Sequence, residues 1–182
     1  MINLGTLQFK SLDENHNLVC DSIITLAQSL DEAMRPLVAE IDPQYMNGKA
    51  LGEHYGINID DGANCVIIEA KNNESSEFVA VVIPVGNRAD LNGFVKKHLG
   101  ARRVSLAPLD KVIEATGMEY GSITPFGLPS SWKILIDEVL MNKEKIIIGG
   151  GKQISKLLVP TAVFKILPNV EIIKGLSSPI EQ

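Results

Sequence analysis

Cysteine, aromatic residues and long apolar runs are all scarce in this sequence of 182 residues. The two cysteines, Cys20 and Cys65, lack metal-ligand spacing and are too few for a disulfide framework. The longest apolar stretch, residues 78–85, is far shorter than the roughly 20 residues that a membrane-spanning helix needs. The first residues lack the basic start and apolar core of a secretory signal. We therefore expect a cytoplasmic protein with reduced thiols and no membrane partner.

An excess of positive charge is also missing. The chain has 22 acidic and 17 basic side chains, a formal net charge of -5. Proteins that hold nucleic acid along an extended backbone usually present a basic surface, so we expect no DNA partner and only a local contact with any nucleic acid. The basic cluster at residues 96–103 is a candidate for phosphate contacts, but cations at a helix end are equally explained by the helix dipole.

Common catalytic motifs are absent as well. The sequence has no GxSxG, HExxH or CxxC, and its three histidines are scattered. The segment GGGK at residues 149–152 is similar to part of a phosphate loop, but no Ser or Thr follows the lysine. The next residues, QISKLLV, have a strand pattern where a phosphate loop would begin a helix. We reject an NTPase function and predict no metal and no cofactor.

What is present is a series of short elements typical of one α/β domain. The tetrapeptide SLDE occurs at residues 11–14 and 29–32, and each copy matches a capping box, so we predict two N-terminal helices. An apolar stripe between them, residues 19–30, has helical spacing. The runs CVIIEAK and FVAVVIPV, joined by a polar turn, predict a β-hairpin. Short turns between strands favour a mixed, mostly antiparallel curved sheet flanked by helices.

Turn residues set the remaining element boundaries. Helices are expected at residues 47–56, 90–100 and 108–117, each ending at a glycine, and after Pro160. Strands are expected at LVAEID, RRVSLA, WKILIDEVL, KIIIGGG, KQISKLLV and VEIIK. We expect an N-terminal helical extension over residues 1–40, the main domain over 41–175, and a loose tail over 176–182.

Two glycine-rich turns remain as candidates for chemistry: GSITPFG at residues 121–127 and IIIGGGK at 146–152. Backbone amides exposed in such turns can donate hydrogen bonds to a developing oxyanion, a contribution of about 3 kcal/mol per donor. Each glycine, taken singly, is also explained by a positive φ angle or by close packing.

Several motifs occur in one order over residues 41–170: ANCVII, a DL helix ending in LGA, a TG loop followed by GxxxP, the strand ILIDEVL, and IIIGGGK. In this order they resemble the YbaK/EbsC-like family of aminoacyl-tRNA deacylases, which includes the editing insertion domain of bacterial prolyl-tRNA synthetase. The resemblance implies a single YbaK-like α/β domain whose partner is the acceptor end of an aminoacyl-tRNA. It also implies hydrolysis of the ester of a mischarged tRNA without a metal or a covalent nucleophile.

The resemblance also implies site residues. The GxxxP loop would shape the amino-acid pocket and present amides near the scissile carbonyl, and the glycine turn would form the opposing wall. The implied catalytic glycines are Gly121, Gly149 and Gly150. The implied substrate-binding residues are Thr124, Pro125, Gly151 and Lys152, with Lys152 near the nucleotide.

Asn64 departs from the family pattern, which typically has a lysine at this position. Lysine supplies a cation, whereas the amide offers a neutral donor and an acceptor. We interpret Asn64 as a catalytic position that orients water or the substrate's α-amino group; a second interpretation is that it only satisfies a strand end. Cys65 is counted with the substrate-binding residues but, by strand alternation, is predicted to be packed and not nucleophilic.

Three functions follow from these patterns. We favour a trans-editing deacylase. The alternative is a non-catalytic protein of the same fold that binds a tRNA 3′ end, a nucleotide or an amino-acid derivative, and Asn64 motivates it. A third possibility is an interaction module that uses the apolar stripe of residues 19–30, which core packing explains equally well. The sequence leaves the amino acid and the oligomeric state open.

Overall fold

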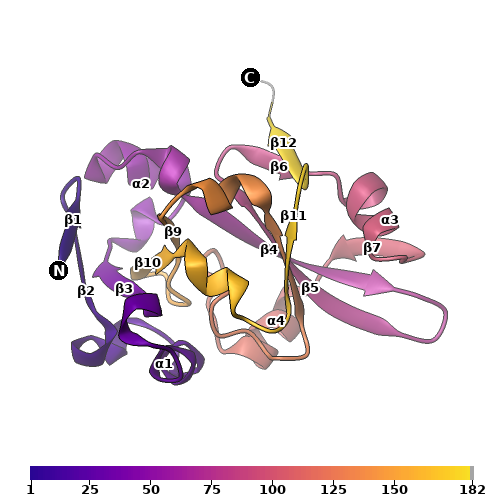
Figure 1. Cartoon of the computed structure of the whole chain (residues 1–182), viewed down its shortest axis with the longest axis horizontal. Helices are drawn as coiled ribbons and strands as arrows, with labels where there is room; N and C mark the ends of the chain where they lie inside the picture. The colour runs from indigo at the N-terminus through magenta and orange to yellow at the C-terminus, as the bar shows by residue number, and fades with distance from the viewer. Residues whose placement is uncertain (181–182) are drawn as a thin grey trace.

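The computed structural model describes residues 1–180, whose strands form two five-stranded sheets and one two-stranded sheet (Figure 1). The first sheet has the order β1-β2-β3-β10-β9 and is antiparallel throughout. Its strands are β1 (Ile2–Leu4), β2 (Leu7–Ser11), β3 (Leu37–Glu40), β10 (Ser155–Pro160) and β9 (Lys145–Gly149).

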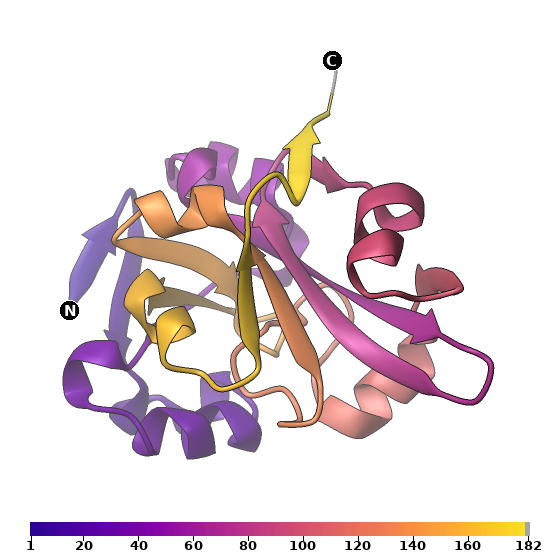
Figure 2. The same cartoon turned by 45° about the vertical axis from the view of Figure 1, so that its right-hand side comes forward.

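The second sheet has the order β11-β8-β5-β4-β7 and is mixed, because β8 pairs in parallel with both β5 and β11. Its strands are β11 (Val170–Ile173), β8 (Lys133–Asp137), β5 (Ser76–Pro84), β4 (Ala63–Lys71) and β7 (Arg103–Leu106). The antiparallel β4–β5 hairpin extends away from the rest of the molecule in Figure 2. The expected mixed, mostly antiparallel, curved arrangement is confirmed.

Four α-helices accompany the sheets: α1 (Asp21–Gln28), α2 (Gly48–Tyr55), α3 (Lys96–His98) and α4 (Leu109–Thr116). The Asn47 side chain caps α2 by accepting from the Ala50 amide at 3.0 Å. Gly56 and Gly117 end α2 and α4 in the left-handed region, as their positions in the sequence predicted. A π-helical turn, Leu91–Val95, leads into α3. In the part of the chain that the structure describes, no helix is long and apolar enough to cross a membrane.

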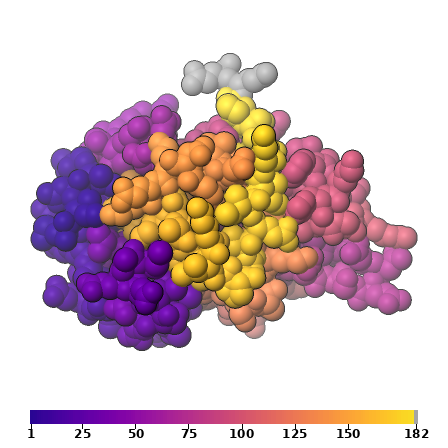
Figure 3. Space-filling view, in the orientation of Figure 1, coloured from indigo at the N-terminus to yellow at the C-terminus, as the bar shows by residue number. Residues whose placement is uncertain are grey.

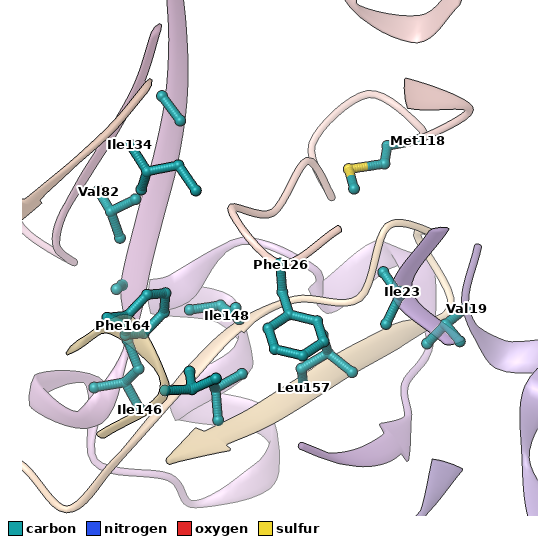
Figure 4. Packing of buried hydrophobic residues seen from close by; sticks show 14 of the residues in the cluster. Val19, Ile23, Val82, Met118, Phe126, Ile134, Ile146, Ile148, Leu157 and Phe164 are labelled. Carbon is teal, nitrogen blue, oxygen red and sulfur yellow. The ribbon is translucent and has the colours of Figure 1, made fainter. Parts of the chain in front are cut away.

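The largest apolar cluster lies between the two sheets and α1. Figure 4 shows Phe126 near Ile148, Leu157 and Ile23, all of them fully buried or nearly so. The N-terminal stripe belongs to this core, since Ile23 is 0% exposed. Burial of this stripe is therefore explained by packing inside the chain, where the hydrophobic effect stabilises the fold.

Two expectations about the ends of the chain were wrong. The first SLDE segment contains a 3-10 turn, Leu12–Glu14, and the second only leads into another, Glu32–Met34, with α1 between them. The asparagines after Glu14 favour turns, and Pro36 follows the second segment closely. Residues 1–40 also contribute three strands, so they are not helical alone.

The tail expected to be loose forms β12 (Ser177–Pro179), which pairs with β6 (Asn87–Ala89). The backbone amide and hydroxyl of Ser177 both donate to the buried Asp137 carboxylate, and this fixes the strand. In Figure 3 the yellow C-terminal segment lies on the surface of the molecule. Residues 181–182, the end of the predicted tail, lie outside the described part.

Candidate active site

A cleft of about 490 Å³ opens where the two sheets meet, next to the parallel bridge between Gly62 and Ile147. The start of β4 forms one wall, and the end of β9 with the start of β10 forms the other. The start of α2, the first turns of α4 and the loop after α4 surround the opening. The lining residues used below are Asn64, Cys65, Gly121, Gly149 and Lys156, together with the rim residues Leu106, Leu109 and Tyr120.

A smaller apolar compartment of about 30 Å³ adjoins this cleft. Its walls come from α2, the loop after α2 and the end of β5, and include Leu51, Ile59 and Val85. Four residues line both spaces: Gly48, Ala63, Asn64 and Lys156. The two spaces therefore adjoin at these residues. A ligand with one group in the compartment and another in the cleft would have to pass this junction.

Asn64 and Cys65 both line the cleft, although alternation predicted that they point to opposite faces. Asn64 is exposed at the start of β4, so it does not satisfy a buried strand end. Cys65 is half-buried and packs against the main core. Burial raises the pKa of its thiol above the ordinary range. A neutral thiol is a weak nucleophile, which agrees with the packing role that the sequence predicted.

The resemblance implied that the two glycine-rich loops form opposing walls, but in the structure they lie side by side and bond to each other, with Asn64 on the opposite wall. The Glu119 amide donates to the Gly151 carbonyl at 2.7 Å, and the Gly151 amide donates to the Ser122 carbonyl at 2.9 Å. The Gln153 amide donates to the Glu119 carboxylate, again at 2.7 Å. These bonds hold the loop after α4 against the turn after β9, so the two segments form one wall of the cleft.

Gly121 and Gly149 are the glycines of these loops that line the cleft. Gly121 is exposed with a φ of 77°, which a residue with a side chain adopts only with strain. A Cβ on Gly149 would lie 2.6 Å from the Ser122 carbonyl oxygen, so the loop approaches this strand more closely than a side chain allows. Within residues 1–180 the Gly121 amide donates to no backbone carbonyl, which leaves it available to a ligand.

The other residues implied by the resemblance do not line the cleft. Gly150 and Gly151 are buried, and a Cβ on each would meet Ser155 and Ile23 respectively. Thr124 and Pro125 are buried behind the loop. The Lys152 ammonium donates to the Asn17 carbonyl at 2.9 Å, on the side of the N-terminal segment. These five residues therefore lie behind or beside the cleft and are absent from its lining.

Lys156 was missed by the sequence reasoning, which treated its segment only as a strand. It is 8% exposed on β10 and lines both the cleft and the compartment. Burial lowers the pKa of its ammonium to about 8. The sequence did contain a sign of this site. Lys156 lies two residues before Leu158, a core residue, so both side chains belong to the same face of the strand, and a charge at a core-facing position is unusual.

The rim of the cleft is apolar and exposed. Tyr120 is 62%, Leu106 66% and Leu109 41% exposed, and all three contribute to the lining. The basic cluster at residues 96–103 does not line the cleft, although Arg103 begins the strand that Leu106 ends.

A sequence model of the aminoacyl-tRNA editing domain matches residues 42–166, more than half of the chain. The chain belongs to this family of aminoacyl-tRNA editing domains. The matched range contains every residue that lines the cleft and the compartment, and the resemblance to YbaK/EbsC-like deacylases is thereby confirmed.

Known proteins agree with this editing-domain assignment. The multifunctional Ser/Thr-tRNA deacylase ProXp-y of Escherichia coli strain K12 is 26% identical over 126 residues, which cover 69% of this chain and 75% of that protein. The crystal structure of hypothetical protein APE2540 has a TM-score of 0.72 at 19% identity and covers 87% of this chain and 100% of that one. A putative trans-editing enzyme for prolyl-tRNA synthetase has a TM-score of 0.68 at 16% identity, covering 86% and 97%. At these identities the two structures show the fold alone.

Proposed function

We propose that this protein is a trans-editing deacylase that hydrolyses the ester of a tRNA mischarged with a small amino acid. The observation that carries the proposal is the pair of adjoining spaces inside the editing domain: an open cleft with an apolar rim, and a smaller compartment that shares Asn64 with the cleft lining. An aminoacyl ester has the matching order of groups, with a nucleoside at one end, the ester in the middle and a side chain at the other end.

The rim is suited to the terminal nucleoside. Tyr120, Leu106 and Leu109 offer an exposed aromatic and aliphatic surface at the mouth of the cleft. Bases stack on aromatic side chains for about 1–3 kcal/mol each, whatever the sequence of the nucleic acid. A contact limited to the last nucleotide also agrees with the net charge of -5, because few phosphates need to be neutralised.

The ester would lie between Asn64 and the glycines of the opposite wall. A water molecule attacks the carbonyl carbon, and the carbonyl electron pair moves to oxygen. When the tetrahedral intermediate collapses, the bond to the ribose oxygen breaks and that oxygen takes the proton from the attacking water. The Gly121 amide donates to the transient oxyanion, while the Asn64 amide group orients the water or the α-amino group.

The compartment limits the side chain. Its volume of about 30 Å³ exceeds the ~10–15 Å³ that one water needs, so it admits a few heavy atoms at most. Seryl, threonyl and alanyl groups fit this limit, and the relative ProXp-y is named a Ser/Thr-tRNA deacylase. We therefore propose small side chains as the substrates and exclude aromatic ones on steric grounds.

The test is a deacylation panel. Wild type, Asn64→Lys and Asn64→Ala are incubated with seryl-, threonyl-, alanyl- and phenylalanyl-tRNA, and release of the amino acid is followed. We expect turnover of at least one small aminoacyl-tRNA and none of phenylalanyl-tRNA. Saturable binding of charged tRNA without turnover on any substrate would instead establish a non-catalytic binding protein. Full activity in Asn64→Ala would remove Asn64 from the mechanism.

A further inference from the structure

Lys156 is the one charged side chain in the lining of the cleft and of the compartment. Its neighbours across the sheet are Gly149 on β9 and Ala39 on β3, the first without a side chain and the second with a single methyl group. Side chains directly opposite each other on paired strands share a face of the sheet, so these two small residues leave room for the lysine stem. Lys156 lines both spaces where they adjoin.

The Lys156 ammonium lacks a partner in the described part of the chain. None of the ion pairs or side-chain hydrogen bonds within residues 1–180 involves it, and the linings of the cleft and the compartment contain no carboxylate. Lys143, whose side chain is far more exposed than that of Lys156, has such a partner, because its ammonium lies 2.8 Å from the Asp61 carboxylate. A buried charge without a partner destabilises the folded protein, and an apolar residue at this strand position would not.

The position of the charge fits one stage of the proposed reaction. Of all lining residues, only Gly48, Ala63, Asn64 and Lys156 contact both spaces. A substrate with its side chain in the compartment and its ribose in the cleft would have its ester at this junction. The ester carbonyl is neutral before attack and negative afterwards, so an ammonium held there binds the transition state more strongly than the ground state.

We propose that Lys156 is a catalytic residue of this site, whose ammonium contacts the ester carbonyl oxygen from the β10 wall and stabilises the negative charge that forms on it. The inference rests on the deacylase function proposed above. Lys156 forms no covalent bond and keeps its proton throughout; the water supplies both the new hydroxyl and the proton for the ribose oxygen. With a pKa of about 8, most of the side chain is protonated at neutral pH.

The experiment compares Lys156→Met with wild type and with Lys145→Met. Methionine keeps an unbranched stem and removes the charge. Lys145 begins β9, the strand that pairs with β10, but lines neither space, so it is a matched control on the same hairpin. Single-turnover deacylation of the best small aminoacyl-tRNA is measured over a range of enzyme concentrations. This separates the rate at saturation from the half-saturating concentration.

We expect Lys156→Met to lower the rate at saturation on the order of 100-fold, the usual loss when one oxyanion donor is removed, with half-saturation within about threefold of wild type. Lys145→Met should retain the wild-type rate. A Lys156→Met rate within about threefold of wild type would overturn the assignment, as would a change confined to half-saturation, which indicates a binding role. If wild type turns over no substrate, both the proposed deacylase function and the assignment of Lys156 fail. If wild type and Lys156→Met are equally active, only the assignment of Lys156 fails. Thermal unfolding of each variant identifies any loss that comes from misfolding.

Discussion

The two walls of the cleft present different chemical groups. On the β4 wall, Asn64 presents an exposed, neutral amide. On the β9–β10 wall, Gly149 brings the backbone close and Lys156 supplies a buried, unpaired charge. The first wall can orient groups by hydrogen bonds, and the second can stabilise negative charge. The cleft therefore has a charged residue in its lining even though Asn64 is neutral.

The largest effect on activity should come from Gly149→Ala, which adds a methyl group on the β9–β10 wall. The added Cβ meets the Ser122 carbonyl oxygen at 2.6 Å, and backbone at that distance must move. We expect deacylation to fall by about 100-fold or more, because misplaced oxyanion donors lose most of their contribution. Gly175→Ala is the control: its Cβ meets nothing within 4 Å, so strain at its positive φ should lower stability without lowering activity. An active Gly149→Ala would show that the loop position is not critical.

The second prediction concerns the stability of the protein and tests whether the β9–β10 wall carries a buried charge. In Lys156 the folded-state pKa is about 8 against an ordinary 10.5, so the folded state disfavours the proton. The destabilisation that the buried ammonium causes is fully present below about pH 8 and decreases as the pH rises toward 10.5. Lys156→Met should therefore raise the free energy of unfolding by up to about 3 kcal/mol at pH 7, with most of the gain lost as the pH reaches 10.5. Urea unfolding at several pH values measures this; an equal gain at both pH values would mean that charge is not its cause.

A third prediction moves the charge from one wall to the other. Asn64 and Lys156 line the same junction, so an ammonium introduced by Asn64→Lys in the Lys156→Met background reaches the same space. We expect this double variant to recover about 10-fold of the lost rate, since an oxyanion donor contributes on the order of 100-fold and the new one is less well positioned. Single-turnover rates measure the recovery. The double variant Asn64→Gln with Lys156→Met is the uncharged control and should recover nothing.

The smallest effect should come from the rim, which both walls share. Tyr120→Ala removes the exposed ring at the mouth of the cleft. Loss of one stacking contact, about 1 kcal/mol, should raise half-saturation about fivefold and leave the rate at saturation unchanged. Tyr120→Phe keeps the ring and should behave as wild type. A fall in the rate at saturation would place Tyr120 in the chemistry and not in nucleoside binding.

Local chemistry made much of the fold predictable. Asn47 and Gly56 bound α2, Gly117 ends α4, and the polar turn after Lys71 joins β4 to β5, all as the turn and cap residues indicated. The SLDE segments misled because a capping box only selects a helix start where a helical run follows. The tail strand was missed because its partner, β6, is about 90 residues away and Asp137 holds it from another sheet.

The sequence by itself indicated the family, the two glycine-rich turns and the position of Asn64, because each lies in a contiguous motif whose spacing is fixed by the chain. Only the tertiary structure decided which residues of these motifs line the cleft. Lys152, inside the motif, bonds to Asn17, whereas Lys156, four residues later, reaches the junction. Strand pairing sets Lys156 between Gly149 and Ala39, and no local pattern encodes a neighbour contributed by a strand more than 100 residues away.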